Sequence, residues 1–381
     1  PPANEDTGSS SEEDDNVDSW SNLSRNLSKH IQWPMKTLAR RSHMVEQLVA
    51  ELLQVCQRRL SKTFFPELQP AIGVGGAFEG WSPNEEEAEY YMLVPLKPPR
   101  GHSFHLELGE TGIALVKDSH IRVELDCTCT EEDILCFVHT SKDDLQRYQA
   151  PSLLHTLCTD SYLHVQRTAS WFQDIVKSAW AAVPQSLHYS LQMIPSRWFC
   201  RMLLTSESGR SLSVVILFGV QQDNSDIYLS SLSVDPYAPG TTWPQTCAVA
   251  EAKFFHFMAR NIHPRNVHLQ CLHLCTCILD GTVITACTMK NVVMHLLQHS
   301  WLQQDLPVWR RRDFVELLLN IMSFLLCCLE NKHLVHFFLG NDSLPEEIIL
   351  PLAFRRSKTV NIFQHLQDHP PTNTAALRAF N

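Results

Sequence analysis

The stretch GVGGAFEGWSPNEEEAEYYMLVPLKPP, residues 73–99, decides the fold of this chain. Its glycine pair, Gly75 and Gly76, predicts a turn at which a phosphate can approach the backbone closely, because neither residue has a Cβ atom and either can adopt positive φ. Glu85 and Glu87 follow at positions i and i+2 and are predicted to begin a strand. Because side chains alternate along a strand, both carboxylates would lie on one face, where they could hold a magnesium ion.

A glycine turn followed by acid-x-acid on a strand is the arrangement of a nucleotidyltransferase. In that chemistry, two metal ions clamp the attacking and leaving oxygens of a phosphoryl transfer. The alternative interpretation of the same residues is a solvated acidic loop beside two glycines. The sequence contains no Walker or Rossmann glycine pattern and no Gly-x-Ser-x-Gly elbow, so the other nucleotide-binding and hydrolase classes have no support.

On the N-terminal side of this stretch, the pattern predicts an acidic linker followed by a long helix. Residues 1–20 contain seven acids and no base, so most of the formal net charge of −10 belongs to this segment, and residues 1–34 are expected to form a disordered linker. Within residues 35–62, apolar side chains recur three and four positions apart. This spacing predicts an amphipathic helix that ends before Pro66.

On the C-terminal side, short β-rich runs give way to helices. The runs that predict strands are residues 90–96, 103–108, 121–127, 198–205, 212–220 and 227–234, and a helix is predicted over 162–183. After the turn-rich residues 235–246, the predicted helices are residues 247–261, 266–279, 286–299, 312–330 and 344–350. The fold class is therefore α+β, with a mixed-sheet lobe over residues 35–240 and an all-helical lobe over residues 241–381.

Several stretches of the chain resemble one protein family. They are GVGGAFEGW, PNEEEAEYYMLVPLKPPRG, DCTC...LCFVH, RWFCRMLLTSESG and LENKHLVHFFLGN. The chain is similar to the inositol 1,4,5-trisphosphate receptor-interacting protein-like group of the Mab-twenty-one (male abnormal) family, over about residues 35–352. The resemblance implies a nucleotidyltransferase-type mixed-sheet lobe with the helix over 35–62 as its spine. It also implies a C-terminal lobe of the helix-hairpin-helix, or helix-two-turn-helix-like, type.

The resemblance further implies that the nucleotidyltransferase site is degenerate. Active members carry a third carboxylate on a neighbouring strand, here SLSVVILFGVQ, and the position expected to hold it is nearest to Val215. No Asp or Glu occurs between Glu207 and Asp223, and Glu87 stands in place of the more usual Asp. We therefore expect a non-catalytic protein-binding member without a cofactor. The alternative is an active enzyme that uses Glu85 and Glu87 with magnesium and a third ligand from elsewhere in the chain.

A synthase-like member of the fold that senses DNA would need a zinc knuckle and a cationic face. The candidate zinc ligands are His268, Cys271, His273, Cys275 and Cys277. Several of these residues and their apolar neighbours fall at helical spacing, so buried thiols on a core helix are the favoured interpretation. Basic residues gather in two short clusters, 310–312 and 355–358, which predict solvated helix ends rather than a nucleic-acid surface.

The partner that the resemblance implies is the inositol 1,4,5-trisphosphate receptor, with a role in modulating calcium release. Members of the group resemble single-pass membrane proteins, so we expect a membrane anchor outside this chain, with the folded part on a side of the membrane that the sequence does not reveal. The chain itself has no apolar run of the roughly 18 residues that a membrane span needs. Its 13 cysteines are irregularly spaced, which favours reduced thiols.

Overall fold

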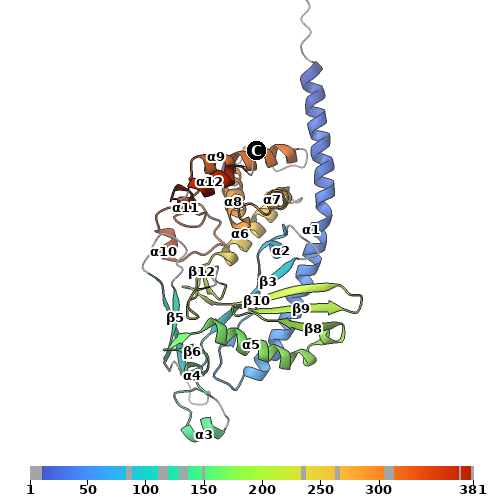
Figure 1. Cartoon of the computed structure of the whole chain (residues 1–381). Coiled ribbons are helices and arrows are strands. Elements are labelled where there is room, and N and C mark those ends of the chain that lie inside the picture. Colours follow the sequence, from blue (N-terminus) through green and yellow to red (C-terminus); the bar gives the residue numbers. More distant parts are fainter. Residues whose placement is uncertain are drawn as a thin grey trace, which may run out of the picture. The chain divides into compact units, whose positions relative to one another are not determined.

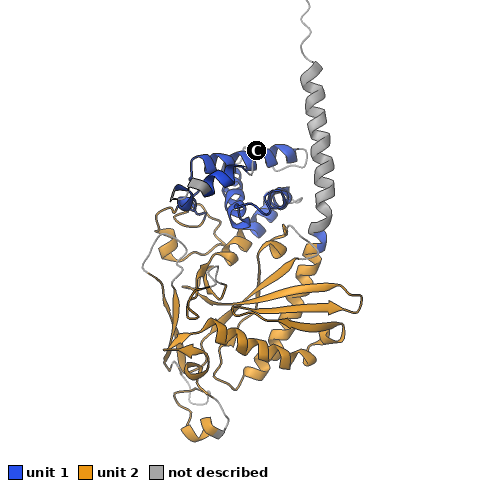
Figure 2. Cartoon of the chain, in the orientation of Figure 1, with its two compact units in different colours: residues 1–37, 255–337, 361–381 blue, residues 38–254, 338–360 orange. Residues whose placement is uncertain are grey.

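The computed structural model divides the chain into two units. The described residues are 11–82, 88–109, 119–127, 129, 136–147, 151–232, 237–261, 267–303, 313–368 and 370–378, and for residues 11–35, 368, 370 and 371 only the backbone is described. Residues 38–254 and 338–360 form one unit, which we call the sheet unit. Residues 1–37, 255–337 and 361–381 form the other, the helical unit (Figure 2).

The long helix α1 (Ser11–Leu60) is amphipathic where its side chains are described. The apolar residues that recur three and four positions apart are buried, among them Leu38, Val45, Leu48, Leu52 and Cys56. The prediction of an amphipathic helix over residues 35–62 is therefore confirmed. The chain leaves the helix at Thr63, whose backbone N–H and hydroxyl both donate to the carbonyl of Leu60.

Helix α1 begins earlier than the sequence pattern predicts. Its backbone is helical from Ser11, inside the segment 1–34 for which the pattern predicts a disordered linker, and residues 1–10 lie outside the described residues. Two properties of the sequence favour this extension. Acids at positions 12–15 and 18 fall in the first turns, where the helix dipole favours negative charge, and no glycine or proline occurs from residue 11 to residue 33.

A mixed sheet of eight strands forms the framework of the sheet unit (Figure 1). Its strands are β1 (Glu67–Leu68), β2 (Ile72–Val74), β3 (Glu89–Lys97), β8 (Tyr189–Ile194), β9 (Cys200–Ser206), β10 (Ser211–Gln221), β11 (Tyr228–Ser230) and β12 (Gln245–Thr246). Strands β3 and β10 run parallel, and the other pairs are antiparallel. The prediction of a mixed sheet is confirmed.

Alternation along β3 and β10 gives this sheet two different faces. On one face, Tyr90 and Phe218 join α1 and α5 (Val165–Ala179) in the main core. Phe172 of α5 packs edge-on against Phe218, with ring centroids 5.2 Å apart. On the opposite face, Tyr91 and Val215 belong to a separate, smaller apolar cluster. Val215, which is nearest to the position expected for the third carboxylate, therefore lies on this second face, because successive residues of a strand point to opposite sides.

The sheet unit also contains an antiparallel sheet of four strands, in the order β4–β5–β7–β6. The strands are β4 (His102–Glu107), β5 (His120–Leu125), β6 (Cys158–Thr159) and β7 (Tyr162–Leu163), and the short helices of the unit are α2 (Gly76–Glu79), α3 (Lys142–Arg147), α4 (Leu153–Thr156), η1 (Trp180–Ala182) and η2 (Pro184–Leu187). The sequence predicts a helix from residue 162, but α5 begins only at Val165. Tyr162 and Leu163 are instead held as a strand, because they pair with Arg122 and Cys158.

The described part of the helical unit is built from helices, as predicted. They are the part of α1 up to Thr37, α7 (Val267–Ile278), α8 (Ala286–Gln303), α9 (Phe314–Glu330), α11 (Gln364–Asp368), α12 (Pro370–Arg378) and the second half of α6 (Ala248–Asn261). Helices α7, α8 and α9 pack against one another, and α12 packs against α9. The helix-hairpin-helix type of this unit stays a prediction. None of the helices in the described ranges combines the length and hydrophobicity needed to cross a bilayer.

The units do not divide at residue 240, where the sequence pattern changes. Residues 338–360 belong to the sheet unit, because the backbone N–H of Ile349 donates to Asp226 Oδ2 at 2.8 Å and the N–H of Asp226 donates to the Ile349 carbonyl at 2.7 Å. The predicted helix over 344–350 is wrong, since this backbone forms a turn and α10 (Leu352–Arg355) follows it. The two bonds with Asp226 engage the backbone of Ile349, and Pro351 further disfavours helical conformation at the residue before it.

Candidate functional site

The glycine pair forms the tight turn between β2 and α2. Gly75 has a φ of 79°, in the left-handed region that favours glycine. A Cβ atom on Gly76 would lie 3.1 Å from the indole of Trp81, so this position is also closely packed. Gly75 lies beside β3, since a Cβ atom there would be 3.8 Å from the ring of Tyr91. The predicted turn is present, and its use in binding phosphate stays a prediction.

The predicted metal ligands Glu85 and Glu87 lie outside the described residues, in the segment 83–87. Strand β3 begins at Glu89, so the first strand carboxylate whose position is described is Glu89. Sequence reasoning missed this residue, although the same acid-x-acid spacing continues from Glu87 to Glu89 and could have pointed to it. Glu89 is the one acid on the three described strands β3, β9 and β10.

The Glu89 carboxylate is held by two side chains of the same face. Arg201 on β9 forms an ion pair with it, with Nη2 3.0 Å from Oε1. The hydroxyl of Tyr91 donates to the other oxygen, Oε2, at 2.5 Å. Burial, and then the hydrogen bond to Glu89, raise the pKa of the Tyr91 phenol, so this hydroxyl remains a donor at physiological pH.

Val215 completes the arrangement from β10. In the sheet register, Val215 lies opposite Tyr91 on one side and opposite Arg201 on the other, while Val74 lies opposite Tyr91. The row Val74–Tyr91–Val215–Arg201 therefore crosses four strands on one face, and Val215 is completely buried in it. The position at which the third acid is expected thus holds a buried apolar side chain.

Arg201 is also packed by its own neighbours. Its guanidinium carbon lies 5.2 Å from the ring centroid of Phe199, which is within the range of a cation–π contact. With Phe199 on one side and Glu89 on the other, the cation is oriented across the sheet face. Chemically, this arrangement stabilises a carboxylate with a fixed cation, where a catalytic site would use metal ions.

Within the described residues, the candidate zinc ligands on α7 do not gather into a metal-binding group. His268, Cys271 and Cys275 are buried in the helical unit, whereas Cys277 is exposed. Burial lowers the pKa of His268 to about 3 and raises the pKa of the Cys275 thiol to about 12, which keeps both groups uncharged. The interpretation of Cys271 and Cys275 as buried thiols is confirmed. All 13 cysteines of the chain are free thiols.

The two basic clusters show no nucleic-acid surface in the described residues. Residues 310–312 lie outside them. Arg355 and Arg356 are exposed at the end of α10, a helix of four residues, and Lys358 is exposed just beyond it. This second cluster is the solvated helix end that the sequence predicts.

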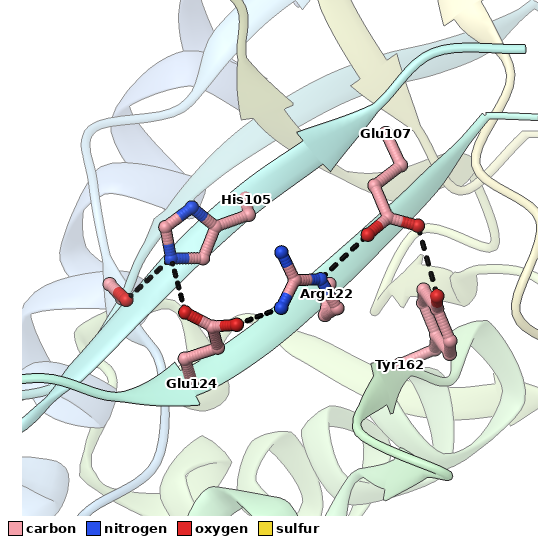
Figure 3. Close-up of polar contacts among 6 residues, drawn as sticks. His105, Glu107, Arg122, Glu124 and Tyr162 are labelled. Carbon is pink, nitrogen blue, oxygen red and sulfur yellow. Dashed lines mark hydrogen bonds and ion pairs between the residues drawn. The ribbon is translucent and has the colours of Figure 1, made fainter.

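Polar side chains on the four-stranded sheet form a network rather than an open site (Figure 3). Arg122 contacts Glu107 through Nε at 2.6 Å and also forms an ion pair with Glu124. The network continues on one side to His105, which lies 3.1 Å from Glu124 and 3.0 Å from the Ser103 hydroxyl, and on the other to Tyr162, whose hydroxyl donates to Glu107 at 2.9 Å. The bonds from Arg122 and then Tyr162 lower the pKa of Glu107. We interpret the network as a clamp that joins β4, β5 and β7.

The fold and the site together define an α+β protein with a tight glycine turn beside a mixed sheet, and Glu89 is the one acid on the described strands β3, β9 and β10. No family model matches the chain. It is 31% identical to the rat inositol 1,4,5-trisphosphate receptor-interacting protein-like 1 over 367 residues, which are 92% of this chain and 66% of the relative. It is 30% identical to the mouse protein of the same name, with the same coverage.

A more distant match extends this relationship. The human inositol 1,4,5-trisphosphate receptor-interacting protein is 26% identical over 357 residues, 86% of this chain and 63% of the relative. The chain belongs to the inositol 1,4,5-trisphosphate receptor-interacting protein-like group. It spans just under two thirds of the length of the curated relatives it matches.

Proposed function

We propose that this chain is a non-catalytic protein-interaction domain that binds the inositol 1,4,5-trisphosphate receptor. The observation that carries the proposal is the match of 92% of the chain to relatives whose names describe interaction with that receptor. A match of this extent covers both units rather than one shared element, so it supports a common role for the folded body. Through the receptor, the chain would modulate calcium release.

The geometry of the sheet face supports the non-catalytic part of the proposal. Two-metal catalysis needs carboxylates that are shared between two divalent cations. On β3, β9 and β10, Glu89 is already paired with the guanidinium of Arg201, and Val215 is apolar and buried. A fixed cation 3.0 Å from the carboxylate repels a second cation at the same oxygens. We infer a Mab-twenty-one-type nucleotidyltransferase fold whose site has become a structural ion pair.

Membrane association is the second, finer part of the proposal. Its support is the resemblance to single-pass proteins of the group, with an anchor supplied by a segment outside this chain. Fractionation of cells that express the full-length protein tests it, since the proposal expects the protein in the membrane pellet after a carbonate wash. Release of the full-length protein by that wash would contradict it.

Receptor binding is tested with purified components. The immobilised chain is incubated with detergent-solubilised inositol 1,4,5-trisphosphate receptor, and the retained receptor is quantified. The proposal expects retention that soluble chain competes away. As a matched control, Glu89→Gln should retain the receptor equally, because the proposal assigns the ion pair between Glu89 and Arg201 a structural role. Absence of competable retention by a folded chain would contradict receptor binding.

Catalysis is tested separately. The chain is incubated with nucleoside triphosphates and Mg²⁺ or Mn²⁺, and the products are separated by chromatography. We expect no turnover. Turnover that disappears in Glu85→Ala, Glu87→Ala or Glu89→Ala would overturn the non-catalytic proposal in favour of an active nucleotidyltransferase.

A further inference from the structure

Four metal-ligating side chains meet in the loop between β5 and α3 of the sheet unit. They are Cys127, Cys129, Cys136 and His139, and their ligand atoms all lie within 4.8 Å of one another. In sequence, they form the pattern C-x-C-x₆-C-x₂-H. We propose that these residues bind one zinc ion as a structural site of the sheet unit.

The distances from Cys127 Sγ to two of the other ligand atoms fit a tetrahedral zinc ion. Zn–S bonds of about 2.3 Å and Zn–N bonds of about 2.0–2.1 Å place tetrahedral ligands about 3.8 Å apart for two sulfurs and about 3.6 Å apart for sulfur and nitrogen. Cys127 Sγ lies 3.7 Å from Cys136 Sγ and 3.6 Å from His139 Nε2. The Nδ1 atom of His139 is farther from Cys127 Sγ, at 3.9 Å, so Nε2 is assigned as the ligand.

The chemistry of the ligand set selects the metal. Three thiolates and one imidazole are soft and borderline donors, which favour Zn²⁺ over the hard cations Mg²⁺ and Ca²⁺. Four protein ligands fill a tetrahedral shell and leave no position for a reacting water, so the site is structural. Binding converts three thiols to thiolates and releases three protons, and the zinc centre then carries a net charge of about −1 with a neutral imidazole.

The loop holds this geometry through bonds to the start of β4. The N–H of Asp126 donates to the carbonyl of Gly101 at 3.1 Å, and the N–H of Phe137 donates to the carbonyl of Arg100 at 3.2 Å. The two arms of the ligand loop are therefore fixed to adjacent residues. A Cβ atom on Gly101 would lie only 2.8 Å from the nitrogen of Phe137 and 3.1 Å from Cys136 Sγ, so glycine permits this close approach.

Local contacts orient the individual ligands. The N–H of Cys129 donates to Cys127 Sγ at 3.4 Å, a bond that favours the thiolate. The N–H of His139 and the hydroxyl of Thr140 both donate to the carbonyl of Cys136, which closes the turn that brings Cys136 and His139 together. The ring of Phe137 packs edge-on against Phe64, with centroids 5.1 Å apart, and anchors this turn in the sheet unit.

A disulfide does not explain the cluster. An S–S bond is about 2.05 Å long, whereas Cys127 and Cys136 are separated by 3.7 Å between sulfurs. Three thiols gathered around one imidazole match a metal site better than any pairwise link. The zinc ion would cross-link the end of β5 to the turn before α3.

Metal analysis of the purified full chain tests the proposal. We expect about one zinc ion per chain after removal of loosely bound metal, and loss of that zinc in Cys127→Ser and Cys136→Ser. The matched controls are Cys277→Ser and Cys287→Ser, which change exposed thiols elsewhere and should keep the zinc. His139→Cys, which completes a four-thiolate shell, should also keep it, whereas His139→Ala should bind more weakly.

X-ray absorption of the wild-type protein keeps the test decisive if the cysteine variants fail to fold. The expected zinc shell has three sulfurs at about 2.3 Å and one nitrogen at about 2.0 Å. A wild-type chain with reduced thiols that contains no zinc would overturn the proposal. A shell of nitrogen and oxygen alone, zinc retained by both folded cysteine variants, or a disulfide between any two of the three cysteines in freshly purified protein would also overturn it.

Discussion

Val215 lies between Tyr91 and Arg201 in the row that crosses the sheet, and none of its surface is exposed. We expect Val215→Asp to lower the free energy of unfolding by about 2–4 kcal/mol, because the new carboxylate is buried beside a guanidinium that Glu89 already binds. Thermal unfolding measures the change. A restored metal site would behave in the opposite way, with stability that rises when Mn²⁺ is added.

The matched control for this substitution is Val215→Asn, which introduces nearly the same shape without the charge. It should cost less than Val215→Asp at neutral pH, and the two should converge at acidic pH as the aspartate becomes protonated. We expect that this face of the sheet holds no catalytic metal site. A Val215→Asp protein that melts at the same temperature as the wild type, or that Mn²⁺ stabilises, would contradict this expectation.

The ion pair between Glu89 and Arg201 gives a second prediction for single substitutions. The Arg201 and Glu89 side chains are 32% and 30% exposed, so the pair is partly screened and Arg201→Gln should cost only about 0.5–1 kcal/mol. Arg201→Lys keeps the charge and should cost less. Chemical denaturation compares the two variants. Equal losses in both would show that the charge does not matter and that packing on Phe199 dominates.

Part of this site could be predicted from the sequence and part could not. The glycine turn and the apolar residue Val215 lie in short motifs, so the local sequence pattern was enough to predict both. The bond between Glu89 and Arg201 joins β3 to β9, strands far apart in the sequence that meet only through β10. Likewise, the pattern pointed to the cysteines of α7, whereas the cysteines that converge do so because Arg100 and Gly101, just before β4, hold both arms of their loop.

The attachment of the segment 338–360 to the rest of the sheet unit depends on the buried carboxylate of Asp226. Asp226 accepts from the N–H of Ile349 and forms an ion pair with Lys253, Nζ to Oδ1 2.7 Å. Asp226→Ala should lower the free energy of unfolding by about 2–3 kcal/mol, because a buried charge-assisted hydrogen bond is lost. It should also speed limited proteolysis near residues 346–347, which are exposed.

Lys253→Met separates the two contacts of Asp226. It removes the ion pair, whose Lys253 end is 40% exposed, together with the 3.3 Å hydrogen bond from Lys253 Nζ to the Glu347 carbonyl, and leaves the hydrogen bond to Ile349 in place. We expect a smaller loss of stability, below about 1 kcal/mol, and little change in proteolysis. If Lys253→Met opened the segment as much as Asp226→Ala, the contacts of Lys253 rather than the bond between Asp226 and Ile349 would hold it.

Helix α7 should make the stability of the chain depend on pH. Burial lowers the pKa of His268 from 6.5 to about 3 in the folded chain. Between these values, the unfolded chain binds a proton that the folded chain does not, so stability falls as pH falls below 6.5. One such histidine contributes about 2 kcal/mol of loss between about pH 7 and about pH 5.

The variant His268→Gln isolates this contribution. It removes the titrating group, so the difference in stability between variant and wild type should shrink by about 2 kcal/mol as the pH is lowered over that range. Melting curves at each pH provide the measurement. Parallel pH profiles for the two proteins would contradict a neutral, buried His268.

For the whole molecule, local periodicity was enough to predict an α+β fold with a spine helix, a mixed sheet and a helical C-terminal part. It could not place the division between the units, because residues 338–360 return to the sheet unit through bonds to Asp226. It also placed the start of the spine helix too late in the sequence. Acidic composition indicates disorder, while the same acids favour the first turns of α1.

The most direct test of a non-catalytic sheet unit is a crystal structure of the chain soaked with Mn²⁺ and a non-hydrolysable nucleoside triphosphate. Anomalous difference density locates the manganese without reference to side-chain positions. We expect the Glu89–Arg201 ion pair to remain intact and no manganese peak beside β3 and β10. A manganese ion bound by Glu89 together with Glu85 or Glu87, with Arg201 displaced, would contradict the proposal and assign the chain to the active nucleotidyltransferases.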